Sequence, residues 1–136
     1  AEYNPFLLDV EFNTIQKDKK LKAYLKKSKC KLLISWHDFK KTPSESQLRT
    51  KFNKMRQLSD IVKIVTVAKN VSDASRLLSL YSIKSKNKTI AFCMGEQGKF
   101  SRILCLHLGS PFTYVSLGKA IAPGQFSVDE VKSLSD

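Results

Sequence analysis

The sequence predicts an α/β fold in which parallel strands alternate with covering helices. Residues 60–69 form a run rich in β-branched apolar residues, which is typical of a strand. Both faces of this run are apolar, as in a parallel strand that is covered on each side. Similar runs elsewhere are separated by segments with the 3.6-residue apolar period of a helix, so the chain repeats a strand–helix unit.

Five apolar runs are predicted as strands, and the amphipathic segments between them as helices. The strands are Phe6–Phe12, Lys31–Trp36, Asp60–Lys69, Thr89–Met94 and Phe112–Leu117. The helices are Thr14–Ser28, Thr42–Leu58, Ser72–Ile83 and Lys99–Leu108. The predicted N-cap is Thr14 or Asn13 for the first of them and Ser72 for the third. A last short helix is expected to open at Ser127, because Glu130 follows it at the spacing of a capping box.

Successive β-α units join through right-handed crossovers into one parallel sheet. Units of this length suit a (β/α)8 TIM barrel, but a full barrel takes about 250 residues. With 136 residues, the chain is expected to form one domain, residues 1–136, that supplies about five units of such a barrel. An open doubly wound sheet is the structural alternative, although no GxGxxG motif follows the first strand.

Composition limits the class of protein further. With 42% hydrophobic residues, the chain should fold around a core. No apolar run approaches the roughly 18 residues that a membrane span needs, and the first residues lack the pattern of a signal peptide. The three cysteines lack CxxC spacing, which indicates reduced thiols and no metal site. We therefore expect a cytoplasmic protein without cofactors.

The formal net charge is +12, and much of it lies in the lysine-rich residues 17–31. Such a segment is typical either of nucleic-acid binding or of a solvated helix face. Tyr24 is the only aromatic residue in the segment, so stacking on bases has little support. The solvated face is preferred, and no nucleic-acid or membrane partner is expected. A basic surface also steers anionic small molecules.

Lys63 stands in the middle of the apolar run at residues 60–69. A lysine there either reaches water or is kept in a poorly solvated place. In the second case burial disfavours the ammonium and favours the neutral amine. A neutral amine is a nucleophile that forms a Schiff base with a carbonyl substrate.

Polar residues follow the carboxyl ends of the predicted strands, which is the face where barrel enzymes carry their active sites. Four segments there are Ser35–Phe39, Val62–Ile64, Met94–Gly95 with Ser101–Arg102, and Ala122–Ser127. In order and spacing, these segments resemble type I 3-dehydroquinate dehydratase, the Schiff-base class. The resemblance extends from Asp9 to nearly the end of the chain. It implies that the five units are the fourth to the eighth of a TIM barrel.

The resemblance also implies a reaction, the syn elimination of water from 3-dehydroquinate to give 3-dehydroshikimate in the shikimate pathway of aromatic amino acid biosynthesis. Lys63 matches the lysine that forms the imine with the substrate ketone. His37 matches the general acid–base residue, and histidine exchanges protons near neutral pH. The matching substrate-binding residues are Arg102, Gln125, Phe39, Met94 and Ile121. Arg102 would clamp the substrate carboxylate, since a guanidinium binds it through two parallel hydrogen bonds.

Two departures from the family are visible. Ile121 occupies the position where the family usually has serine, so a hydroxyl contact to substrate is missing and Ile121→Ser should lower KM. The family also has about three further β-α units before the first predicted strand, which carry a glutamate that orients the histidine. Glu11 is interpreted as a structural or supporting carboxylate. The chain alone is therefore expected to be inactive, with the first and last strands as open edges.

The open edges of the first and last predicted strands also lead us to expect partners. Open parallel edges recruit other strands, so the chain should self-associate or pair with the missing units. A homodimer is expected for the full-length protein. Two other functions stay open from the sequence: another Schiff-base barrel enzyme of the class I aldolase kind, and a non-catalytic basic nucleic-acid-binding module.

Overall fold

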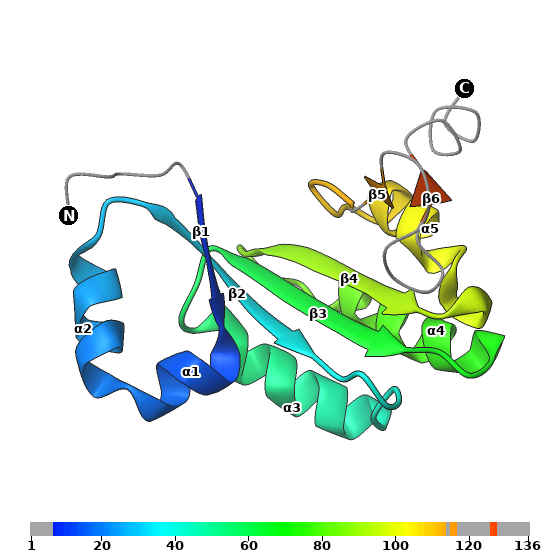
Figure 1. Ribbon diagram of the computed structural model, residues 1–136, viewed down its shortest axis with the longest axis horizontal. Helices are drawn as coiled ribbons and strands as arrows, with labels where there is room; N and C mark the ends of the chain where they lie inside the picture. The colour runs from blue at the N-terminus through cyan, green and yellow to red at the C-terminus, as the bar shows by residue number, and fades with distance from the viewer. Residues whose placement is uncertain (1–6, 114, 117–125, 128–136) are drawn as a thin grey trace.

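A four-stranded parallel sheet in the order β1-β2-β3-β4 forms the centre of the protein (Figure 1). The computed structural model describes residues 7–113, 115–116 and 126–127. The strands are β1 (Leu7–Glu11), β2 (Lys31–His37), β3 (Ile61–Val67) and β4 (Lys88–Met94). Each strand pairs with the next in the chain, so the sheet has the sequential order that a barrel uses. The four predicted strands in this region are confirmed.

Helices lie between the strands. They are α1 (Phe12–Lys17), α2 (Lys19–Lys27), α3 (Glu45–Arg56), α4 (Val71–Leu78) and α5 (Ser101–His107), with short 3-10 turns η1 (Ser79–Ser82) and η2 (Glu96–Gly98). Helices α1, α3 and α4 lie along one face of the sheet (Figure 1), and their side chains share a core cluster with residues of β2, β3 and β4. Phe52 and Leu77 there contact a core that includes Val62 and Ile64 of β3. Since side chains alternate along a strand, Lys63 projects from the opposite face.

Three predicted helix boundaries are wrong, and side-chain caps explain them. The predicted helix Thr14–Ser28 is broken at Asp18, whose carboxylate accepts a hydrogen bond from the Leu21 N–H at 2.9 Å and so starts α2. α3 begins at Glu45 and not at Thr42, because Ser44 caps it in a capping box with Gln47. Asn70, not Ser72, caps α4. For α3 and α4, a short polar side chain within two residues of the predicted start satisfies the first free N–H groups.

The predicted fifth strand, Phe112–Leu117, is wrong as a member of the main sheet. Among the described residues of that stretch, β5 (Val115–Ser116) is extended, and it pairs in parallel with β6 (Phe126–Ser127) in a separate two-stranded sheet. Ser127, the predicted first residue of the last helix, lies in β6. The rest of the predicted last helix lies outside the described residues, and so does Leu117.

Side chains occupy the outer edge of β4. The Tyr81 hydroxyl accepts a hydrogen bond from the Ala91 N–H at 2.7 Å and donates one to the Ala91 carbonyl at 3.0 Å. The Ser101 hydroxyl accepts one from the Cys93 N–H at 2.7 Å. A fifth strand paired with β4 would need these same backbone groups. The backbone groups of Ala91 and Cys93 at this edge are therefore paired by residues that come before and after the strand. Burial of the Tyr81 side chain raises its pKa.

Replacing Tyr81 by phenylalanine is expected to destabilise the fold by about 1–3 kcal/mol, because a buried N–H and a buried carbonyl lose their partner together. The free energy of unfolding from urea titration measures this loss. Tyr24→Phe is the matched control, since Tyr24 is 56% exposed. Equal stability of the two variants would mean that another group pairs with Ala91 once the hydroxyl is gone.

Candidate functional site

The face of the sheet opposite α3 carries a row of polar side chains near the carboxyl ends of the strands. Ser35 of β2 is the register partner of Lys63 in β3, and Glu11 of β1 is the register partner of Ser35. His37 pairs with Val65, two residues after Lys63. Paired residues of a parallel sheet share a face, and so do residues two apart. The register therefore brings Glu11, His37 and Lys63 to one face.

Lys63 is buried within this face, with 8% of its surface exposed. Its Nζ lies 3.9 Å from Oδ2 of Asp9 in β1, whose side chain is about half exposed. The other carboxylate oxygen of Asp9 accepts a hydrogen bond from the Ser35 hydroxyl at 2.7 Å. Ser35 thus orients Asp9 toward the amine. Of the two alternatives left open by the sequence, the burial of Lys63 supports the poorly solvated one.

His37 at the end of β2 is held by a carboxylate of this same chain. Its Nδ1 lies 2.8 Å from Oε1 of Glu11, which leaves Nε2 for another partner. The ring of Phe39 stacks on the imidazole, with the centroids 5.6 Å apart and the planes 7° from parallel. This contact agrees with the interpretation of Glu11 as a supporting carboxylate. The described residues thus already contain a glutamate in contact with this histidine, in addition to any that preceding units carry.

Arg102 enters the same face from the start of α5. It is 3% exposed, and its guanidinium carbon lies 4.6 Å from the centre of the Phe92 ring. Phe92 is the register partner of Val65, so Arg102 lies over the neighbouring part of the face that carries Lys63. Burial lowers the pKa of Arg102 from its ordinary value. Among the described residues, its buried Nε has no hydrogen-bond partner, as expected of a group that awaits an anionic ligand.

The other predicted site residues have mixed outcomes. Met94 is buried at the end of β4 in the core cluster on this face, whereas Phe39 is 74% exposed and contacts His37 from the side of solvent. Gln125 and Ile121 lie outside the described residues.

Sequence reasoning overlooked Asp9, Ser35 and Phe92. The alternation Asp9-Val10-Glu11 in a predicted strand was the available signal, because it directs two carboxylates to one face.

The site combines three chemical capacities. A buried amine next to a carboxylate suits covalent attachment of a carbonyl compound. An imidazole held through one nitrogen suits proton transfer through the other. A guanidinium with an unused donor suits a carboxylate. Over the described ranges, no three His, Cys, Asp or Glu side chains are grouped to hold a metal ion, and no helix has the length and apolarity of a membrane span.

Comparison with known proteins identifies the family. The model of the family "Type I 3-dehydroquinase" matches residues 1–135. A 3-dehydroquinate dehydratase of Pyrobaculum aerophilum is 43% identical over 130 residues, which are 94% of this chain and 41% of that protein. One of Methanocaldococcus jannaschii is 38% identical over 136 residues, 98% of this chain and 61% of that protein.

Solved structures agree with the sequence relatives. The 3-dehydroquinate dehydratase of Aquifex aeolicus aligns with a TM-score of 0.81 at 33% identity, covering 95% of this chain and 58% of that one. The type I enzyme of Clostridium difficile, solved with covalently modified comenic acid, also has a TM-score of 0.81, at 28% identity, and the match covers 95% of this chain and 53% of that one. The chain thus spans about half the length of the proteins that it matches, with the parallel β-α architecture of their TIM barrels. This chain belongs to the type I 3-dehydroquinase family.

Proposed function

We propose that this chain supplies the imine-forming half of a type I 3-dehydroquinate dehydratase, a hydro-lyase that converts 3-dehydroquinate to 3-dehydroshikimate and water. The observation that carries the proposal is the shared face of a buried lysine, a carboxylate-held histidine and a buried arginine. The covalently modified ligand in the Clostridium difficile relative supports covalent chemistry in this family. The reaction would serve the shikimate pathway of aromatic amino acid biosynthesis.

The first chemical step uses Lys63. Its ammonium gives up a proton, and the resulting amine attacks the ketone carbon of the substrate. The carbonyl oxygen takes up that proton and a second one from the nitrogen and leaves as water, so that a protonated imine remains. The positive charge of the former ammonium is kept in this imine. Asp9, 3.9 Å from Nζ, therefore faces a cation both before and after the covalent bond forms. Ser35 keeps that carboxylate directed at the nitrogen.

The second step uses His37. The protonated imine withdraws electrons and acidifies the neighbouring C–H, whose proton passes to the free ring nitrogen of His37. The hydroxyl at the β carbon then takes a proton from the imidazolium and leaves as water. Glu11 stabilises the imidazolium and fixes the ring through Nδ1. Hydrolysis of the imine releases 3-dehydroshikimate and restores Lys63.

The remaining residues would bind the substrate. The unused Nε donor of Arg102 supports a role as the clamp for the substrate carboxylate. Met94 would form an apolar wall, and Phe39 would cover His37 on the side of solvent. Gln125 and Ile121 are proposed as contacts on the basis of the resemblance alone.

The chain would act as part of a larger assembly. We propose that residues 1–136 form the C-terminal portion, the fourth to eighth units, of a TIM-barrel dehydratase in the cytoplasm. The expected partners are the preceding units of the barrel, or a second copy of the chain through the open sheet. For a full-length barrel protein we propose a homodimer.

The test compares the chain alone with the chain mixed with the first β-α units of the Methanocaldococcus jannaschii relative. Formation of the conjugated enone of 3-dehydroshikimate is followed by ultraviolet absorbance, and we expect it only in the mixture. Borohydride trapping with an aldol donor in place of dehydroquinate tests the aldolase alternative, and a salt titration of RNA binding tests the nucleic-acid alternative. Absence of turnover and of trapped adduct in both samples would contradict the proposal.

A further inference from the structure

Residues 38–44 connect β2 to α3 and carry Phe39 onto the ring of His37. The segment begins with Asp38, whose N–H donates to the Val65 carbonyl of β3 at 2.9 Å. The Asp38 carboxylate accepts hydrogen bonds from the backbone N–H groups of Lys40 and Lys41 at 2.9 and 3.0 Å. The start of the segment is therefore a turn fixed to the neighbouring strand.

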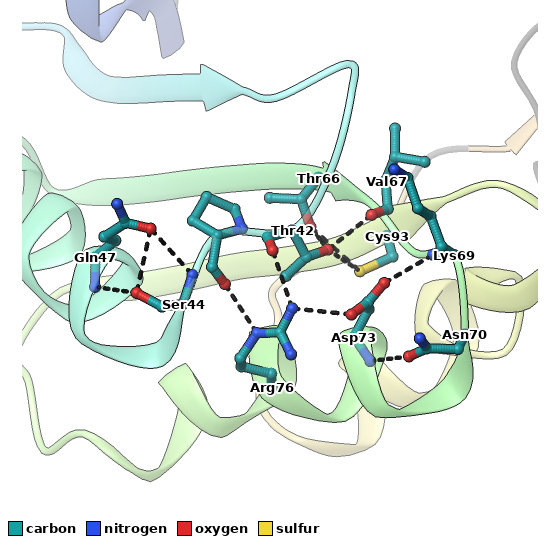
Figure 2. Close-up of polar contacts among 11 residues, drawn as sticks. Thr42, Ser44, Gln47, Thr66, Val67, Lys69, Asn70, Asp73, Arg76 and Cys93 are labelled. Carbon is teal, nitrogen blue, oxygen red and sulfur yellow. Dashed lines mark hydrogen bonds and ion pairs between the residues drawn. The ribbon is translucent and has the colours of Figure 1, made fainter.

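The far end of the segment is fixed by Thr42, which is 6% exposed. Its hydroxyl donates to the Val67 carbonyl at 2.8 Å and lies 2.8 Å from the Thr66 hydroxyl, both at the end of β3 (Figure 2). The Thr66 hydroxyl in turn lies 3.4 Å from the Cys93 sulfur of β4. The segment is thus joined to the ends of two strands of the sheet.

Arg76 of α4 holds the backbone at the same point. Its Nε donates to the Pro43 carbonyl at 2.8 Å, and its Nη2 donates to the Thr42 carbonyl at 2.9 Å and to Oδ1 of Asp73 at 2.9 Å (Figure 2). The other oxygen of Asp73 accepts from the Lys69 N–H at 2.9 Å. This last bond, aided by Arg76 and opposed by burial, holds the pKa of Asp73 below its ordinary value. The guanidinium of Arg76 therefore joins α4 to residues 42–43 through two charged hydrogen bonds.

Phe39 depends on these backbone contacts for its position. It is 74% exposed, so packing against the core restrains it little. Its described ring contact is the stack on His37 at 5.6 Å. The stacked position of the Phe39 ring therefore depends on the backbone conformation of residues 38–44, which is set by the contacts at the two ends of the segment.

We propose that Arg76 is a positioning residue for His37: by fixing the Thr42 and Pro43 carbonyls it sets the course of residues 38–44 and keeps Phe39 stacked on the imidazole. The inference rests on the proposed function, because His37 is the group whose placement matters. Arg76 lies on α4 behind the sheet and does not join the row of side chains around Lys63. A displacement of a catalytic group by about 1 Å costs up to about 10²-fold in rate.

The experiment follows the ring protons of His37 by NMR in the 136-residue chain, with His107→Gln used to assign the two histidines. Stacking under Phe39 shifts these resonances upfield, and Phe39→Leu gives their position without the stack. In Arg76→Met we expect the His37 resonances to move most of the way to the Phe39→Leu position. Arg76→Lys, which can still donate to one carbonyl, should move them less. Arg49→Met is the matched control, because Arg49 pairs only at the exposed surface of α3 with Glu45.

Activity gives an independent reading. In a preparation with dehydratase activity, Arg76→Met should lower kcat about tenfold while borohydride still attaches the substrate to Lys63. Unshifted His37 resonances in folded Arg76→Met would overturn the inference, whether or not the proposed function holds. If Arg76→Met does not fold, Thr42→Val removes the hydroxyl at the same end of the segment, and unshifted resonances there would overturn it equally. Absence of turnover and of trapped adduct in the mixture of the unaltered chain with the preceding β-α units would instead count against the proposed function alone.

Discussion

Replacing Lys63 by alanine is expected to abolish both dehydratase turnover and the covalent attachment of substrate. Of the lysines that the structure describes, only Lys63 is buried, and it lies on the same face as His37. Borohydride reduces the imine to a stable secondary amine, so the adduct adds mass to one peptide. Peptide mapping of the unaltered protein should find that mass on Lys63, and the alanine variant should lack it.

Two further variants separate chemistry from folding. Lys63→Met keeps most of the side-chain volume without the amine, so it should be inactive yet folded, because Asp9, which loses its cation, is about half exposed to water. Lys63→Arg should also be inactive, since a guanidinium stays protonated. Lys40→Ala, an exposed lysine near the same edge, should keep the activity. An adduct on another lysine in an active preparation would contradict the assignment.

Local rules predicted the central sheet well because its strands are apolar throughout. β2, β3 and β4 begin and end close to the predicted residues. The apolar residues at the centre of each strand indicate a strand without any knowledge of which other segments contact it. Helix starts were predicted less well, because Asp18 and Asn70 compete with their neighbours for the cap. The prediction of a fifth strand in the main sheet was wrong because the Tyr81 and Ser101 side chains occupy the edge of β4. No local sequence pattern reveals their contact with that edge.

The candidate site was also predicted only in part, because some of its contacts join residues that are distant in the sequence. Lys63, His37 and Arg102 were chosen because they match the motifs of the family. The strand register brings Lys63 and His37 to one face, and Arg102 reaches that face from α5. The contact of Glu11 with His37 was not predicted, since it joins residues 26 apart in the sequence. Only strand register decides such a contact. Its signal in the sequence is the two-residue spacing of Asp9 and Glu11, which becomes useful once β1 is known to neighbour β2.

Replacing His37 by alanine is expected to lower kcat by roughly 10²–10⁴-fold, the usual loss when a general acid–base group is removed. Lys63 and Asp9 remain in that variant, so the imine should still form, slowly, and then persist because its hydrolysis is impaired. Mass spectrometry without borohydride should therefore detect more covalent complex in His37→Ala than in the unaltered protein. Near-normal turnover in the variant would mean that the imidazole is structural.

Glu11→Gln is a milder change that tests how Glu11 supports His37. The amide oxygen can still accept a hydrogen bond from Nδ1, but the negative charge that stabilises an imidazolium is gone. The loss in kcat should therefore be smaller than for His37→Ala, and it should vanish when both residues are replaced, because Glu11 acts through the ring. Glu45→Gln, an exposed carboxylate on α3, is the matched control. If the losses of the two single variants multiplied in the double variant, Glu11 would act on the substrate by a route that does not pass through His37.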